Sequence, residues 1–202
     1  MGNLGAGAGF GCQATVREAV RAGLIPANDA LIRVEAADGK TYVFGTELNQ
    51  PFLEAPASVW SIIASGITSA GGKPPDILEI VKRAAQTLGT PDYAKLTVPE
   101  EHQPQEPVFD MLKTQWPPLY EYVRRQYKCG VDPLTTGWLF AEAARAIIIS
   151  KTTNLPPEIA GTIVIEAAVR ASKLDPETVS GGSLPPSSEN SLLEIFRKIL
   201  KR

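Results

Sequence analysis

IAGTIVIEAAVRAS, residues 159–172, and GWLFAEAARAIIIS, residues 137–150, are the most apolar stretches of the chain. Each is shorter than the roughly 20 residues that a helix needs to cross a bilayer, and each carries a Glu and an Arg near its middle. We therefore expect two helices of a protein core. Asp132–Pro133 and Pro156–Pro157 fit the starts of these helices, because proline is tolerated in a first turn.

The charges inside the two stretches are Glu142, Arg145, Glu166 and Arg170. If the two helices pack as an antiparallel pair, these charges can meet across the seam. Carboxylates placed in this way bind metals in some helical bundles, but the Glu-x-x-His motifs of that chemistry are missing. We expect a structural cluster of ion pairs instead.

A β-hairpin is predicted at 30–45. Apolar and polar residues alternate on both sides of Asp38-Gly39, a dipeptide that suits a two-residue type I′ turn. Such a turn places Val34 opposite Val43, Glu35 opposite Tyr42 and Arg33 opposite Phe44. Because an isolated hairpin is barely stable in water, a helix must cover one of its faces or another strand must join it.

Helical spacing prevails in most of the remaining sequence, notably in PASVWSIIASGITSAGG at 56–72 and PPDILEIVKRAAQTLG at 74–89. The predicted fold class is therefore mainly α, α+β only in the weak sense, with a helical bundle-like body. Five segments are expected: a mixed part at 1–90, a polar loop at 91–107, an all-helical part at 108–179, a linker at 180–190 and an amphipathic helix at 191–202. The sequence leaves open whether the two larger parts are one domain or two.

The glycine-rich beginning of the chain, MGNLGAGAGFGCQATVREAV, raises the question of phosphate binding. Glycines stand at positions 2, 5, 7, 9 and 11. The dinucleotide-binding fingerprint must follow a strand, and only four residues precede Gly5; the Lys-Ser/Thr pair of a P-loop is missing as well. We expect a mobile or extended leader, followed by a helix that begins near Cys12 or Gln13 and ends before Gly23 and Pro26.

Composition and charge argue against a nucleic-acid-binding protein and favour a cytoplasmic one. The net charge of -2 and the pI near 5.6 argue against a nucleic-acid partner. The segment LYEYVRRQYKCG, at 119–130, has a helical stripe that suits stacking on nucleic-acid bases, formed by Tyr120, Arg124, Tyr127 and Lys128. In the alternative, which we favour, Leu119, Val123 and Tyr127 face the core. With two cysteines and no basic-then-apolar leader at the N-terminus, a cytoplasmic protein is expected.

No catalytic residues, cofactor or metal ligands are predicted. The single histidine, His102, lies in PEEHQPQEP among acidic residues, and one imidazole is thin support for a metal site or a catalytic triad. An alternative remains open, in which a small enzyme or ligand-binding protein has a pocket near the 91–107 loop and draws on His102 or Glu106.

The C-terminal segment carries the strongest functional signal. After the linker of Gly, Ser and Pro, residues 191–202 read SLLEIFRKILKR, and one helical face holds Leu192, Ile195, Phe196 and Ile199. Such a helix can fold back on its own body, bind in the groove of a partner, or lie on an anionic membrane, which is the weakest of the three hypotheses. We expect a non-enzymatic interaction or adaptor protein that binds a protein partner, or a second copy of itself, through these four residues.

Overall fold

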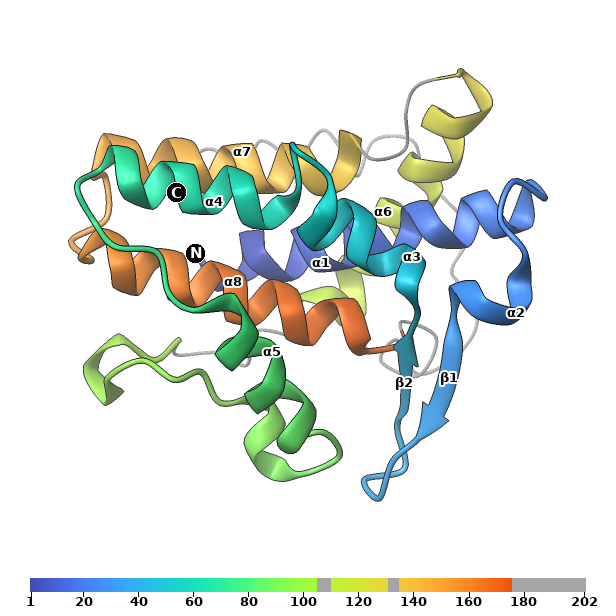
Figure 1. The fold of residues 1–202 in the computed structure, drawn as a ribbon, viewed down its shortest axis with the longest axis horizontal. Helices are drawn as coiled ribbons and strands as arrows, with labels where there is room; N and C mark the ends of the chain where they lie inside the picture. Colours follow the sequence, from blue (N-terminus) through green and yellow to red (C-terminus); the bar gives the residue numbers. More distant parts are fainter. Residues whose placement is uncertain (105–109, 131–134, 176–202) are drawn as a thin grey trace.

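The computed structural model describes residues 1–104, 110–130 and 135–175, and these form a mainly helical body with a small two-stranded antiparallel sheet (Figure 1). The long helices have the following bounds: α1 Gly2–Arg21, α4 Val59–Ser69, α5 Ile77–Gln86, α6 Asp110–Lys128, α7 Thr135–Ser150 and α8 Pro157–Lys173. The shorter elements are α2 Ala27–Ala30, β1 Ile32–Glu35, β2 Thr41–Phe44, α3 Thr46–Asn49, a π-type turn at Gln50–Glu54, and 3₁₀ turns at Pro91–Ala94 and Glu100–His102. The predicted fold class is confirmed.

Helices α1 and α8 lie at the centre of the body and separate two apolar cores. On one side they pack with α4, α5 and α7; the core there includes Ala8, Ile63, Ala144 and Val164. On the other side they pack with α6, β2 and the 87–104 segment; that core includes Phe10, Tyr42, Val123 and Ala167. The two helices apolar enough to suggest a core, α7 and α8, thus do form one, with α1 packed against both.

The prediction for the glycine-rich beginning is wrong. Residues 2–21 form one continuous helix, and Gly5, Gly7, Gly9 and Gly11 are all buried in it. A Cβ on Gly9 would lie 2.2 Å from the backbone oxygen of Ala168 in α8, and one on Gly11 would lie 2.8 Å from the backbone nitrogen of Gly137 in α7. The glycines are therefore needed for close helix packing. Glycine composition suggested a loop, but tertiary packing overrides this weak local preference.

The hairpin exists, but its predicted register is wrong by one residue. The observed pairs are Ile32–Phe44, Arg33–Val43, Val34–Tyr42 and Glu35–Thr41. The connection has three residues, 37–39, closed by the Ala36 N–H donating to the Lys40 carbonyl at 3.0 Å, and Gly39 has a φ of +75°. This is the longer hairpin loop, in which a type I turn is followed by a left-handed glycine.

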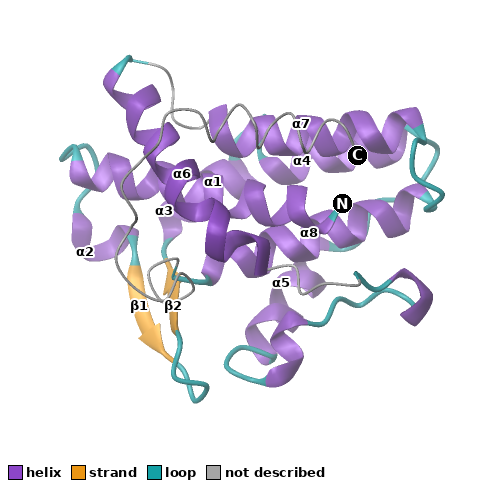
Figure 2. Ribbon diagram, turned by 180° about the vertical axis from the view of Figure 1, so that it is seen from behind, coloured by secondary structure: helices purple, strands orange, loops and turns teal. Residues whose placement is uncertain are grey.

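The hairpin has support on one edge, as expected for so small a sheet. Tyr42 forms a bridge with Leu174, and the Asp175 N–H donates to the Thr41 carbonyl at 3.0 Å (Figure 2). Tyr42 is fully buried, and burial together with its hydrogen bond to Asp38 raises the pKa of its phenol to about 12. The end of α8 therefore anchors the hairpin to the body.

Local sequence signals explain the ends of the other helices. Ser58 accepts a hydrogen bond from the Ser61 N–H at the start of α4, and Asp76 caps α5. Gly23, with a φ of +74°, follows the end of α1 as expected. No helix among the described residues is long and apolar enough to cross a membrane.

Candidate functional site

The four residues predicted to bind a partner, Leu192, Ile195, Phe196 and Ile199, lie outside the described residues, as do the 180–190 linker and Glu106. Their role therefore stays a prediction. Among the described residues, three features are candidates for a functional site: a buried ionic cluster on α8, a second set of ion pairs at the end of α1, and an apolar stripe on the surface of α7.

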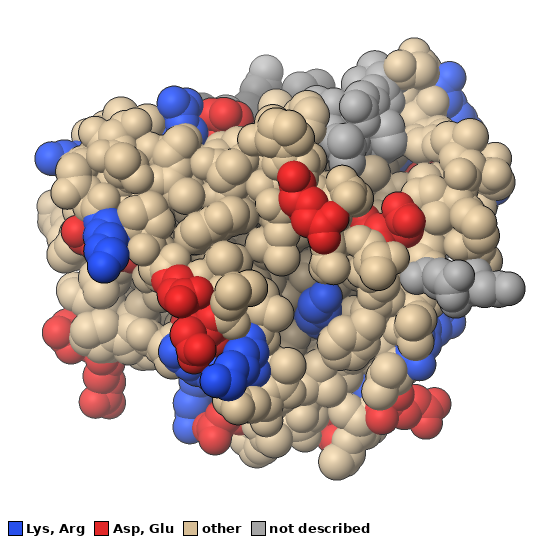
Figure 3. All heavy atoms as spheres, in the orientation of Figure 1, with Lys and Arg blue, Asp and Glu red and all other residues tan. Residues whose placement is uncertain are grey.

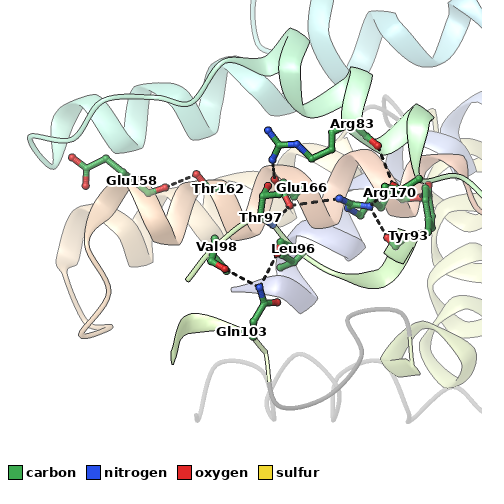
Figure 4. Close-up of polar contacts among 11 residues, drawn as sticks. Arg83, Tyr93, Leu96, Thr97, Val98, Gln103, Glu158, Thr162, Glu166 and Arg170 are labelled. Atoms are coloured by element: carbon green, nitrogen blue, oxygen red, sulfur yellow. Dashed lines mark hydrogen bonds and ion pairs between the residues drawn. The ribbon is translucent and has the colours of Figure 1, made fainter. Parts of the chain in front are cut away.

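The buried ionic cluster is built around Glu166 in the middle of α8 (Figure 4). Its Oε2 accepts a hydrogen bond from the Thr97 backbone N–H at 2.7 Å, and its Oε1 lies 3.5 Å from Nη1 of Arg83 in α5. Arg170 stands one turn further along α8, with its Nη2 3.8 Å from Oε2 of Glu166. The carboxylate therefore has one donor from the loop and two guanidinium groups beside it.

Arg170 extends the same cluster toward the 87–97 segment. Its Nη1 donates to the Tyr93 carbonyl at 2.6 Å and to Oγ1 of Thr87 at 3.2 Å, and its guanidinium carbon lies 5.5 Å from the centre of the Tyr93 ring. The Tyr93 hydroxyl donates to the Arg170 carbonyl at 2.8 Å. We call Arg83, Tyr93, Thr97, Glu166 and Arg170 the α8 clamp, because they fasten this segment to α8.

Burial governs the electrostatics of the clamp. Glu166 and Arg170 are both almost fully buried. Desolvation raises the pKa of the Glu166 carboxyl, against the opposing effects of the Thr97 N–H and the two arginines, and lowers the pKa of the Arg170 guanidinium. Apart from Arg170 Nε, which is buried without a hydrogen-bond partner among the described residues, these donors and acceptors bind one another, so the arrangement serves to hold the loop in place.

The expected meeting of charges between α7 and α8 does not occur. Glu142 and Arg145 form an exposed pair on α7, with Arg145 Nη1 3.1 Å from Glu142 Oε2, and Arg145 Nε donates to Ser65 of α4 at 3.2 Å. Glu166 and Arg170 pair with each other and with Arg83 of α5, away from Glu142 and Arg145 in the ion-pair network. The four charges form two separate ion-pair groups.

The 91–104 segment, where an alternative pocket was expected, lies against α8. Tyr93, Leu96 and Val98 are buried in the second core, and Nε2 of Gln103 donates to the carbonyls of Leu96 at 2.7 Å and Val98 at 2.9 Å. His102 is half-buried in the 3₁₀ turn that follows. No three His, Cys, Asp or Glu side chains lie together as a metal site within the described part of the chain.

The second set of ion pairs joins the end of α1 to α6 and β1. Asp175 is buried; its Oδ1 lies 2.9 Å from Arg17 Nη2, and its Oδ2 lies 3.2 Å from Arg33 Nε. Glu18 is buried as well, with Arg21 Nε 3.2 Å and Arg124 Nε 3.7 Å from its oxygens. These contacts connect the C-terminal end of α1 with parts of the chain far away in sequence.

The aromatic and basic stripe on α6 is mostly occupied inside the molecule. Leu119 and Val123 are buried, as the favoured interpretation required, whereas Tyr127 is only half-buried. Tyr120 stacks on Trp116 with 5.3 Å between ring centres, and Arg124 pairs with Glu18 and Glu121. Tyr120 and Arg124 therefore already have partners within the body.

An apolar stripe remains on the outer side of α7. Leu139 is 45% exposed, Ala146 is exposed, and Ala143 and Ile147 are half-buried. The neighbouring α4 adds little charge: no Asp, Glu, Lys or Arg occurs at 55–72, and Figure 3 shows few charged side chains over α4. A chain in which 21% of residues are charged would carry about four in such a stretch, so this surface is unusually neutral.

The two cysteines are free. Cys12 is buried beside Gly137 and its thiol pKa is raised by burial to about 12, while Cys129 is exposed at the end of α6.

Sequence reasoning identified Glu166 and Arg170 as charges inside an apolar helix, but it did not identify their partners. Arg83, Tyr93 and Thr97 lie between 69 and 83 positions away along the chain, and nothing in their local sequence marks them. Comparison of the chain with known protein families, with curated protein sequences and with solved structures found no match.

Proposed function

We propose that this is a non-enzymatic protein–protein interaction or adaptor protein of the cytoplasm, which binds a protein partner through its C-terminal amphipathic helix. The observation that carries the proposal is the sequence of 191–202: Leu192, Ile195, Phe196 and Ile199 follow the i, i+3, i+4, i+7 spacing of helices that bind in apolar grooves. The preceding 180–190 stretch of Gly, Ser and Pro suits a tether.

The contacts of the body support this proposal. Its most deeply buried charged groups, Glu166, Arg170, Glu18 and Asp175, have ion-pair partners within the chain that hold its own elements together. The neutral outer surface of α4 and α7 is instead typical of surfaces that meet another protein.

A second copy of the chain is the first partner to test. Light scattering should give a mass that rises above the monomer as the protein is concentrated toward the millimolar range, the range of local concentration for a tethered helix. Phe196→Asp should keep the mass at that of a monomer without changing the circular dichroism of the body. Ser191→Asp, outside the apolar face, is the matched control and should associate as the parent does.

If Phe196→Asp associates as strongly as the parent, the C-terminal helix is not the contact and the proposal fails. A chain ending at Ser180 gives a second reading: a monomer with an unchanged melting temperature supports a helix that serves association. A monomeric parent whose melting temperature falls on truncation would instead make the helix part of the core.

A further inference from the structure

Helix α7 is apolar on most sides, and its outer side is only partly covered by the described residues. Its inner positions Ala141, Ala144 and Ile148 are buried in the first core. The outer stripe, which we define as Leu139, Ala143, Ala146 and Ile147, follows helical spacing on another side, with Leu139 and Ala146 exposed. A helix that is apolar all round is normally buried, so we expect another surface to cover this stripe.

The charges around the stripe leave it open to an apolar ligand. Between residues 135 and 150 the only charged side chains are Glu142 and Arg145, which pair with each other at 3.1 Å. Glu142 lies three residues after Leu139 and four before Ala146, so this exposed ion pair borders the stripe. No other charge on α7 has to be desolvated when an apolar helix packs there.

The chain itself supplies a matching segment. The stripe on α7 and the face of 191–202 are both apolar rows at spacings of three and four, as in pairs of helices packed along their length. The described chain ends at Asp175, and fifteen residues, 176–190, separate it from Ser191. Fifteen residues reach up to about 50 Å when extended, whereas the sixteen residues of α7 are only about 24 Å long.

Tethering and charge favour the same chain as the ligand. A short flexible tether gives a local concentration in the millimolar range, which a free partner or a second copy must exceed. Residues 191–202 carry four cations and Glu194, a charge of +3, which leaves -5 for the rest of a chain whose net charge is -2. Because the two parts of the chain have opposite net charge they attract each other weakly, and salt screens this attraction beyond about 10 Å.

We propose that the outer stripe of α7 is the docking site for the C-terminal helix of the same chain. Docking covers Leu192, Ile195, Phe196 and Ile199, the residues that the proposed function assigns to a partner, so a partner binds only by displacing α7. Above the local concentration, the same contact forms between copies by exchange of the helix. The inference goes beyond the proposed function, since docking within one chain requires no partner.

Hydrogen–deuterium exchange of the full chain tests the inference, at a low concentration where light scattering gives a monomer. A helix of twelve residues is barely stable alone in water, so protection of the 191–202 amides reports docking. We expect these amides to exchange at least about ten times faster in Ala146→Lys than in the parent, which is a loss of about 1.4 kcal/mol. The introduced cation opposes both the apolar contact and the cations of the helix.

Ala85→Lys is the matched control, because Ala85 is an exposed alanine on α5, outside the stripe; it should leave the exchange of 191–202 unchanged. Leu139→Lys is a second variant on the stripe in case Ala146→Lys unfolds, and it should act in the same direction. Equal exchange in the parent and in both stripe variants would overturn the inference. Protection that appears only when the mass doubles would overturn it too, because the ligand would then be a second copy.

The two proposals fail in different ways. Loss of protection in Ala146→Lys together with a monomeric parent at every concentration retains the docking site and rejects self-association. Self-association that Phe196→Asp abolishes, with 191–202 exchange unaffected by either stripe variant, retains the helix as the contact and rejects α7 as its site.

Discussion

The glycines of α1, which lack a Cβ atom, determine how closely this helix approaches its neighbours. Gly5 and Gly9 lie one turn apart over Val164 and Ala168 of α8, where an added Cβ would come within 2.1 and 2.2 Å of a backbone oxygen. Glycine in a helix interior costs about 1 kcal/mol relative to alanine. Burial of α1 on several sides must offset that cost, so the glycines are retained for fit and not for flexibility.

Replacing Gly9 with alanine therefore should destabilise the protein, although helix propensity alone predicts the opposite. The new Cβ meets the Ala168 carbonyl and the Ser172 backbone nitrogen, which cannot turn aside as side chains do. We expect a loss of about 1–3 kcal/mol in the free energy of unfolding by urea. Gly66→Ala, whose Cβ meets the half-exposed side chain of Arg145, should lose less. A Gly9→Ala protein more stable than the parent would contradict this close packing of α1 on α8.

Glu166 gives the clamp a pH dependence of defined sign. Because burial raises the pKa of this carboxyl in the folded state, its contribution to stability is present below the unfolded pKa and is lost as the pH rises through the folded one. Glu166→Gln keeps the shape and removes the titration. Urea unfolding should show that the parent's free energy of unfolding, with the variant's subtracted, is larger near pH 4.5 than at pH 7. A difference that grows with pH would mean that Arg83 and Arg170 outweigh burial.

At the scale of elements, the sequence predicted which helices and strands exist better than where they begin and pair. The Asp38-Gly39 signal located the hairpin, but a loop of two or of three residues fits the same dipeptide, and one residue changes every pair. For α1, alternating glycine and alanine contain no apolar periodicity, so the first ten residues gave no helical signal. Only contact with Val164, Ala168 and Gly137, more than 120 positions away, explains their helix.

Helix α5 depends on its cap more than the buried helices do. Asp76 accepts from the Leu78 N–H at 2.9 Å, with Glu79 N at 3.4 Å, and several residues of α5 are exposed. Asp76→Ala should lower the free energy of unfolding by about 1 kcal/mol. Asp92→Ala, which removes only the exposed ion pair with Lys95, should cost less. Equal losses in the two variants, measured by thermal unfolding, would mean that the Asp76 cap contributes no more to stability than an exposed ion pair.

At the scale of the whole molecule, the order of packing differs from the order of sequence. Helix α1 belongs to the first part of the chain, but its neighbours α7 and α8 belong to the last. Both cores take residues from both parts: Ala8 with Ala144 in one, and Phe10 with Val123 in the other. The α8 clamp adds a polar connection between the 87–97 segment and α8. The change of composition near 91–107 is visible in the sequence, but these long-range contacts are not, which is why one domain or two remained open there.

This interleaving predicts how the chain behaves when it is cut between residues 104 and 105. Neither fragment should show cooperative thermal unfolding alone: the first lacks the surfaces of α7 and α8 that compensate for the glycines of α1, and a glycine-rich helix of this length is unstable in water. The second fragment should expose the apolar inner faces of α7 and α8 and aggregate. Mixed and refolded together, the two should form a 1:1 complex with the circular dichroism of the intact chain. Cooperative unfolding of either fragment by itself would mean that the parts are separate domains, and that the contacts of α1 with α7 and α8 join two stable units instead of building one.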